Sequence, residues 1–504
     1  MYFKNIYLLS VVSILLFSSC GEDDSTDSST SSKERSLTNS EVAQEDRSTN
    51  EDTSTEDTYS ENSTKDENVV NVSTITEFRQ ALEDATANGK NDRIVLSAGT
   101  YKTTADNLGT FAFDDNEEFY LTIEAKSGLS YEDVILSGDN LNQVFNFDNS
   151  EESTLILKNL SIINGNSETD GGGVYSNQNI KIDRCKISNN SSDSGYYGLA
   201  GGGGFYVEKN TTLTKSIISE NRATTGYYSR GGGFVSKGKT IIKDSVISNN
   251  SAEQTGGGFV STGNLILIKT NISQNSATWG GGFDAKGVIS IKNSSISKNS
   301  ATYDAGGFTA DGEMTIINSS IFENSAENSG GGFKNDGYYS KTILINSIVS
   351  NNSAKEGAIF TGNHSYVSNN IFVGNKGSIN SSGYGLFVNN IFDKNDVDIT
   401  LNSDAKVYNN YIDYTKIEDN DFNIIKKRNL QPASVGEIDL NSDNTLKANS
   451  PAIDKGLNPN SSTFKDLVED DEIYNEILEN IKIDMNGKAR INSGTIDIGA
   501  IEYR

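Results

Sequence analysis

Lysine and arginine side chains recur directly after a short aliphatic run in a chain that is otherwise strongly acidic. The five positions are Arg184, Lys215, Lys243, Lys269 and Lys292. In stacked repeats these cations form a stripe along which an anionic polysaccharide could lie. A Lys or Arg is also the usual type of base in β-elimination from an acidic sugar. The same pattern is typical of solvated strand ends, so both interpretations stay open.

Aromatic side chains precede a run of glycines or small residues in several repeats. They are Tyr197, Tyr228, Trp279 and Tyr303, and Trp279 is the only tryptophan in the chain. A ridge of such rings would offer a stacking platform for sugar rings. Alternatively, the rings shield the edge of the repeats and stack on one another.

Acidic residues form no hydrolase signature. Glycoside hydrolysis needs two carboxylates about 5–10 Å apart. The one histidine, His364, does not stand in the Gly-His-Gly string of polygalacturonases. Asp439–Asp443 begins with the spacing of a Ca²⁺ loop but lacks the glycine and the final acid of that loop. No metal ligand or cofactor is therefore assigned, and a Ca²⁺ ion held by acids at the ends of the repeats stays open.

A repeat must position these residues. Phenylalanines recur at intervals of 25, 24, 25 and 25 residues, each after three small residues and before an aliphatic run. A fixed period in the range of about 20–50 residues marks a repeat architecture whose units stack. The phenylalanines are Phe234, Phe259, Phe283, Phe308 and Phe333.

Each repeat contains three short runs with period two, in which the phenylalanine faces inward and the next residue outward. No run is long enough for an ordinary helix, and the chain has 3 prolines. The pattern predicts an all-β fold, a right-handed parallel β-helix with three short strands per coil of about 25 residues.

A column of asparagines closes the repeats. Asparagine tolerates the left-handed backbone angles of a tight turn. Amides stacked at the strand spacing of about 4.8 Å can also hydrogen-bond to one another. We therefore expect a structural ladder rather than a catalytic column at Asn250, Asn275, Asn299, Asn324 and Asn352.

The chain begins with a charged residue, a short apolar run and Ser18-Ser19-Cys20, which is typical of a secretory signal over residues 1–19. Leu16–Cys20 resembles a bacterial lipobox, which implies cleavage before Cys20 and lipidation of that residue. Residues 20–68 are acidic and rich in Ser and Thr, and they predict a disordered tether. Cys185 stands among isoleucines and is expected in the core.

Three further resemblances cover the rest of the chain. In residues 69–170, a predicted helix with Phe78, Ala81 and Leu82 on one stripe is similar to the capping helix that opens pectate-lyase-like β-helix proteins. The regular repeats of residues 171–395 resemble those of chlamydial polymorphic outer-membrane proteins, most closely at Gly357–Ile359. Residues 396–504 form the last coils and a C-terminal cap. Ser450–Gly456 and Asp484–Tyr503 resemble the closing segment of secreted bacterial β-helix proteins.

The net charge of −27 argues against nucleic acid as a partner, because its readers need a basic surface. The sequence predicts an exported lipoprotein, anchored in the membrane by its lipid and displayed at the outer membrane or cell surface. Its β-helix would act as an adhesin or bind an extracellular polysaccharide or another surface ligand. The alternative is a membrane-anchored polysaccharide lyase that acts on an acidic glycan.

Overall fold

The computed structural model describes residues 67–193, 201–224, 229–337, 340–401, 403–419, 424–438, 440–491 and 494–503. The predicted signal, Cys20 and almost all of the tether lie outside these residues, as do Tyr197 and Tyr228. No helix within the described ranges is long and apolar enough to cross a membrane.

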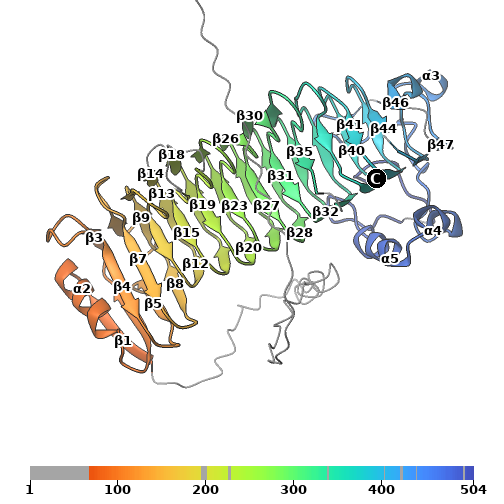
Figure 1. Ribbon diagram of the computed structural model, residues 1–504. Helices are drawn as coiled ribbons and strands as arrows, with labels where there is room; N and C mark the ends of the chain where they lie inside the picture. The colour runs from red at the N-terminus through yellow and green to blue at the C-terminus, as the bar shows by residue number, and fades with distance from the viewer. Residues whose placement is uncertain are drawn as a thin grey trace, which may run out of the picture.

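The described chain winds into an elongated parallel β-helix, which Figure 1 shows from the side. One coil consists of β23 (Phe259–Ser261), β24 (Leu265–Ile268), β25 (Asn271–Ser273) and β26 (Ser276–Trp279). These four strands belong to four different sheets, which we name C, A, B and D in that order. Every strand pairs in parallel with the equivalent strands of the coils before and after it. The all-β fold class and the parallel β-helix are confirmed.

The strands of the four sheets have the following bounds. Sheet A contains β1 (Glu67–Val72), β2 (Asn91–Leu96), β5 (Leu121–Ala125), β8 (Thr154–Lys158), β12 (Asn179–Asp183), β16 (Thr211–Thr214), β20 (Thr240–Lys243), β24, β28 (Ile289–Lys292), β32 (Glu313–Ile317), β36 (Lys341–Ile345), β39 (His364–Ser368), β42 (Tyr384–Val388), β45 (Ala405–Tyr408) and β47 (Ile424–Lys427). Sheet B contains β3 (Gly99–Lys102), β6 (Val134–Ser137), β9 (Ser161–Ile163), β13 (Lys186–Ser188), β17 (Ile217–Ser219), β21 (Val246–Ser248), β25, β29 (Ser295–Ser297), β33 (Ser320–Phe322), β37 (Ile348–Ser350), β40 (Ile371–Val373) and β43 (Ile391–Asp393). Sheet C contains β4 (Phe111–Asp115), β7 (Phe145–Asn149), β11 (Val174–Ser176), β15 (Phe205–Val207), β19 (Phe234–Ser236), β23, β27 (Phe283–Lys286), β31 (Phe308–Asp311), β35 (Phe333–Asn335), β38 (Ile359–Phe360), β41 (Ile379–Ser381), β44 (Ile399–Leu401) and β46 (Ile417–Asp419). Sheet D contains β10 (Asn166–Ser167), β14 (Ser191–Asp193), β18 (Arg222–Thr224), β22 (Ser251–Ala252), β26, β30 (Ser300–Asp304) and β34 (Ser325–Ala326).

Sheet D is a difference from the prediction of three strands per coil, because the middle coils have four. Its strands follow the asparagine column and contain the Ser-Ala pairs of the repeat. The alanines Ala223, Ala252 and Ala277 are buried and pack on one another. Their small size left this run outside the aliphatic pattern, although its backbone pairs like the other strands.

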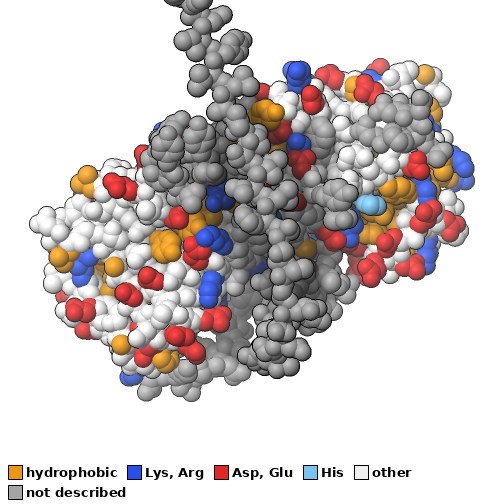
Figure 2. Space-filling view, in the orientation of Figure 1, with side chains coloured by type: hydrophobic (Ala, Val, Ile, Leu, Met, Phe, Trp, Pro, Cys, Tyr) orange, Lys and Arg blue, Asp and Glu red, His pale blue; other side chains and the backbone are white. Residues whose placement is uncertain are grey.

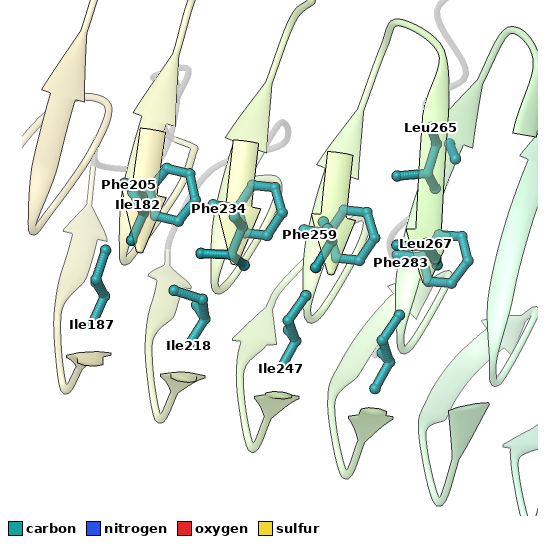
Figure 3. Close-up of a cluster of buried hydrophobic side chains, with 14 of the residues drawn as sticks. Ile182, Ile187, Phe205, Ile218, Phe234, Ile247, Phe259, Leu265, Leu267 and Phe283 are labelled. Atoms are coloured by element: carbon teal, nitrogen blue, oxygen red, sulfur yellow. The ribbon is translucent and has the colours of Figure 1, made fainter. Parts of the chain in front are cut away.

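The predicted phenylalanines form a continuous stack inside the helix (Figure 3). All five are 0% exposed, and rings on successive coils lie with centroids 4.5–5.1 Å apart. Phe205 extends the stack by one coil, at 4.5 Å from Phe234. The outward position that follows each phenylalanine varies from buried Val260 to half-buried Asp284, so outward side chains also contact one another over sheet C.

The glycine triplet before each phenylalanine has a steric cause. Gly256 has φ +65°, in the left-handed region. A Cβ on Gly257 would lie 2.3 Å from the backbone oxygen of Gly281, and a Cβ on Gly258 would lie 2.4 Å from that of Gly282. Side chains are therefore excluded where the coils approach most closely.

The asparagine column forms a buried hydrogen-bonded ladder. Asn299 shows the pattern: its Nδ2 donates to Asn324 Oδ1 and to Ile272 O, both at 3.0 Å. Its Oδ1 accepts bonds from the backbone N–H and the Nδ2 of Asn275, both at 3.0 Å. The rungs bond in sequence through Asn190, Asn221, Asn250, Asn275, Asn299, Asn324, Asn352, Asn375 and Asn395.

The expected reason for this column was partly wrong. The left-handed angle belongs to the residue before each ladder asparagine, such as Asn249 at φ 56° and Gln274 at φ 58°. The ladder residue itself is selected because its amide both donates and accepts.

A second ladder, made of hydroxyls, runs along the corner between sheets A and B. Ser294 Oγ accepts the N–H of Thr270 at 3.2 Å, and Ser319 Oγ accepts that of Ser294 at 3.2 Å. From Asn370 onward the same column consists of asparagines. The sequence did not reveal this ladder, because its members are of three residue types: Ser or Thr in the earlier coils and Asn in the later ones.

The N-terminal end of the helix is capped as predicted. Helix α2 (Ile75–Asp84) begins at Thr74, whose side chain accepts the N–H of Glu77 while Glu77 accepts that of Thr74. Phe78 is 0% exposed, and the centroid of its ring lies 4.9 Å from that of Phe111 in the first coils. The helix therefore covers the open end of the hydrophobic interior.

The C-terminal segment packs along the side of the last coils rather than only across their end (Figure 1). Helices α4 (Ser462–Val468) and α5 (Asp471–Asn480) bury apolar side chains against the outer face of sheet A. The short helices η1 (Tyr414–Lys416) and α3 (Pro432–Val435) precede them. The two predicted closing strings come together where Asp497 Oδ1 accepts the N–H of Asp454 at 2.7 Å.

Replacing one rung of the ladder tests its contribution to stability. Asn299→Ala removes both donors and the acceptor of a 0% exposed side chain and leaves partners on both neighbouring coils unsatisfied. Each unsatisfied buried group costs about 1–3 kcal/mol, so we expect a loss of about 2–4 kcal/mol in thermal or urea unfolding. The control is Asn271→Ala, on the exposed start of β25 in the preceding coil, which should change stability by less than about 0.5 kcal/mol. Equal effects of the two substitutions would contradict this role of the ladder.

Candidate functional site

Two exposed aromatic rings stand together where sheet D leads into sheet C. Trp279 ends β26 and is 37% exposed, and Tyr303 in β30 is 50% exposed. Their centroids are 6.0 Å apart with an interplanar angle of 67°. We call this pair the aromatic ridge.

An irregularity in strand pairing creates the ridge. Ala277 pairs with Ala301 but Trp279 pairs with Asp304, so β26 is one residue shorter than β30 over this stretch. The coil of Trp279 is also one residue shorter than the coil before it, because Ser251 pairs with Ser276 while Thr255 pairs with Trp279. A bulge of this kind redirects a side chain. Here it places the ring of Tyr303 beside that of Trp279.

Asp304 fastens the turn that follows Tyr303. Its carboxylate accepts the N–H and the hydroxyl of Ser329 at 3.0 and 2.7 Å, and the amide of Asn328 at 2.8 Å. Lys334 Nζ donates to the same carboxylate at 2.9 Å. Burial alone would raise the pKa of Asp304, but these bonds outweigh it and hold the pKa below its usual value. These bonds tie the residue after Tyr303 to the turn and strand of the next coil.

A second group of side chains lies on the outer face of sheet C, nearer the N-terminus. Tyr175 and Tyr206 stack at 5.9 Å, and Lys237 Nζ lies 5.2 Å from the centre of the Tyr206 ring. Lys237 also pairs with Glu208 at 2.6 Å. Sheet C thus presents aromatic and charged groups along several consecutive coils.

The lysines of this face remain protonated near neutral pH. Burial lowers the pKa of Lys334, but its bonds to Asp304 and to Asp336 at 3.1 Å outweigh burial and raise it. For Lys237, burial is likewise outweighed by Glu208 and Tyr206, and the pKa is raised. A lysine held as the ammonium form is a poor general base, which disfavours elimination chemistry at either position.

Asp170 is a half-buried acid in the turn that leads into β11 of sheet C. Burial raises its pKa to about 6, although a backbone hydrogen bond from Gly201 opposes the shift. A Cβ on Gly201 would lie 3.5 Å from the carboxylate, so this glycine leaves space for it.

The predicted basic stripe is divided between two adjacent columns. Arg184, Lys215 and Lys269 occupy the left-handed corner after sheet A, with φ between 48° and 51°. Lys243 and Lys292 stand one residue earlier, as the last residues of β20 and β28. The reason is that Asp244 and Asn293 take the corner position in those two coils.

Two members of the stripe already have protein partners. Arg184 pairs with Asp183 at 2.6 Å and donates to Asn159 at 3.0 Å. The charge of Lys292 acts on Glu476 of α5, a buried acid whose pKa is raised by burial. Anion binding along the stripe stays a prediction.

Other candidate chemistry on the chain is sparse. Across the described ranges, His, Cys, Asp and Glu side chains form no group of three or more that could hold a metal ion. Cys185 is 0% exposed, and burial raises the pKa of its thiol to about 12. A protonated, buried thiol is a poor nucleophile.

Sequence reasoning identified the ridge but not the groups that hold it. Asp304 lies on one coil, and Ser329 and Lys334 lie on the next, so no spacing within one repeat connects the carboxylate to its partners. One signal was present: the coil that contains Tyr303 has one more residue between its Ser-Ala pair and the next phenylalanine than the coil before it.

The geometry defines the class of protein: a parallel β-helix with an aromatic ridge beside its sheet C. No family model and no curated protein matches the chain. Among solved structures it is similar to that of the pectate lyase Pel9A, with 14% identity and a TM-score of 0.31 over 85% of this chain and 91% of the other.

The raised pKa of Asp170 predicts a pH dependence of stability. Because the folded-state pKa of about 6 lies above the ordinary aspartate value of 3.8, this carboxyl stabilises the fold fully below about pH 4 and loses that contribution as the pH rises through 6. Asp170→Asn should therefore gain stability relative to the parent between pH 4 and pH 8, by about 1–2 kcal/mol after allowing for partial exposure. Melting curves of both proteins at the two pH values measure the change. Asp114→Asn, at an exposed position of sheet C, is the control and should show no such change.

Proposed function

We propose that the protein is a lipid-anchored, surface-displayed β-helix that binds polysaccharide at the aromatic ridge. The observation that carries this proposal is the pair of exposed rings of Trp279 and Tyr303, placed side by side by a strand bulge. Large exposed aromatic side chains are costly to leave in water and are enriched at binding surfaces. Their flat faces complement the C–H faces of sugar rings.

The setting of the ridge supports a polymeric ligand. Successive coils repeat at about 4.8 Å, so an extended chain meets groups at regular intervals. The backbone around the ridge is already held by Asp304, which reduces the entropy lost on binding. An adhesin or glycan-binding scaffold is thus favoured.

The lyase alternative has less support on sheet C. A lysine does lie between two acids there, since Lys334 contacts Asp304 and Asp336. The raised pKa of Lys334 keeps it an ion-pair partner rather than a base. Binding without turnover is therefore our first proposal.

Anchoring rests on the sequence of the first residues, Ser18-Ser19-Cys20, followed by an acidic segment. The first described strand, β1, lies at the α2 end of the solenoid (Figure 1). A tether attached there would hold that end nearest the membrane and leave the middle coils accessible.

Ligand binding should be visible in the fluorescence of Trp279, the only tryptophan of the chain. Titration with a panel of soluble polysaccharides should shift its emission for at least one of them. Tyr303→Ala keeps the reporter and should weaken that binding by about tenfold or more, which corresponds to about 1.4 kcal/mol. Trp279→Ala removes the fluorescent reporter, so its affinity is measured by calorimetry. This substitution should weaken binding at least as much.

The control for this titration is Tyr120→Ala, another exposed aromatic, on the N-terminal coils. It should leave the affinity unchanged. If Tyr303→Ala and Trp279→Ala both retain parental affinity for every glycan bound, the ridge is not the binding site.

The anchor is tested separately. Cys20→Ala removes the only residue that the predicted signal offers for lipidation, so the protein should move from the washed membrane fraction to the soluble exported fraction. Ser19→Ala, which keeps a small residue before the cysteine, should remain in the membrane fraction. Equal membrane retention of parent and Cys20→Ala would rule out the lipid anchor.

A further inference from the structure

The two rings of the aromatic ridge are set in a way that suits a cation. Their planes lie at 67° in an edge-to-face arrangement, so the rings contact one another and their exposed faces point in different directions. The face of an aromatic ring attracts a positive charge, and the attraction is strongest for tryptophan. A cationic group against the exposed face of either ring would be attracted to it.

The surface beside the ridge has an excess of negative charge. On the three coils of β27, β31 and β35, the outer face of sheet C and the turn leading into it carry five acids and two lysines. The acids are Asp284, Asp304, Asp311, Glu327 and Asp336, and the lysines are Lys286 and Lys334.

The lysines do not compensate this excess. Lys334 is held between Asp304 and Asp336. Lys286 and Asp311 are backbone partners on neighbouring strands of sheet C, and both side chains are exposed. Asp284 is half-buried and accepts the hydroxyl of Thr309 at 2.5 Å. An incoming anion would therefore meet net repulsion, and an incoming cation net attraction.

The whole chain points in the same direction. Its net charge is −27, and acidic side chains are spread over the face shown in Figure 2, with lysines and arginines between them. Such a field attracts a polycation from a distance and repels an acidic polysaccharide.

Building on the proposed glycan-binding function, we propose that the ligand of the aromatic ridge is a glycan with free, protonated amino groups. Its sugar faces pack on Trp279 and Tyr303, and its ammonium groups lie against the rings and the acids of sheet C. This assignment differs from the acidic polysaccharide that the basic residues suggested, because those residues stand at the end of sheet A and two of them interact with acids of the protein.

The test compares the binding of a glycan in its free-amine and N-acetylated forms, measured by Trp279 fluorescence and calorimetry at pH 5.5. The probes are β-1,4-linked glucosamine oligosaccharides and their fully N-acetylated counterparts of the same length, with polygalacturonate as the acidic comparison. The free-amine form should bind at least about tenfold more tightly than the N-acetylated form. Its affinity should fall as salt rises, because the charges are exposed.

A variant pair links the preference to this surface. Asp311→Asn combined with Asp336→Asn removes two exposed carboxylates, at the end of β31 and directly after β35 on the outer face of sheet C, and should lower the free-amine affinity several-fold while leaving the N-acetylated affinity unchanged. Glu151→Gln combined with Glu152→Gln makes the same change of charge on an N-terminal coil and should alter neither affinity.

The outcomes separate the two proposals. Equal affinity for both forms, or tighter binding of polygalacturonate, overturns the amino-glycan assignment and leaves glycan binding at the ridge in place. An unchanged preference in the Asp311/Asp336 variant also overturns it. Absence of binding to every glycan, in both fluorescence and calorimetry, overturns the proposed function and this inference together.

Discussion

The hydrogen bond between equivalent side chains of successive coils is the interaction on which this structure depends. In the asparagine ladder an amide such as that of Asn299 donates to both neighbouring coils and accepts from the preceding one, inside the protein and away from water. A buried amide is stabilising only when its donors and its acceptor are all bonded. One coil alone cannot satisfy the amide, so the ladder makes each coil depend on its neighbours.

The ladder also determines where the functional candidates lie. The run from Ser276 to Trp279 starts directly after Asn275, whose position is set by bonds to both neighbouring coils. Glycines then bring the backbones so close that no side chain fits between them. The length of chain between these two points can vary, and the coil of Trp279 is one residue shorter than the coils on either side, which shifts the register between β26 and β30 and places Trp279 beside Tyr303. A regular scaffold with one local irregularity thus produces the exposed pair.

Several charged groups on the outer surface form ion pairs between coils. Lys237 with Glu208 and Lys334 with Asp304 both join side chains of neighbouring repeats. Such pairs stabilise stacking only modestly, since they are partly exposed. They also keep the lysines protonated, which suits recognition of a ligand better than proton abstraction. The C-terminal segment adds a different contact, because its helices cover the outer face of sheet A with apolar side chains.

The sequence by itself determined the period, the inward phenylalanines, the glycine triplets and the capping stripe of Phe78, Ala81 and Leu82. Each of these is a local pattern repeated at a constant interval, and the nearest neighbour of a coil in space is also its neighbour in sequence. The ladder column was equally visible, although its left-handed angle belongs to the preceding residue. Only the tertiary structure decided the fourth sheet, the hydroxyl ladder, the division of the basic stripe and the hydrogen bonds from Ser329 and Lys334 to the Asp304 carboxylate. These features depend on the register between coils of unequal length, and one extra residue changes which side chains meet. The lateral docking of α4 and α5 likewise joins Glu476 to Thr315 at 2.9 Å across 161 residues of chain, a contact that no local pattern encodes.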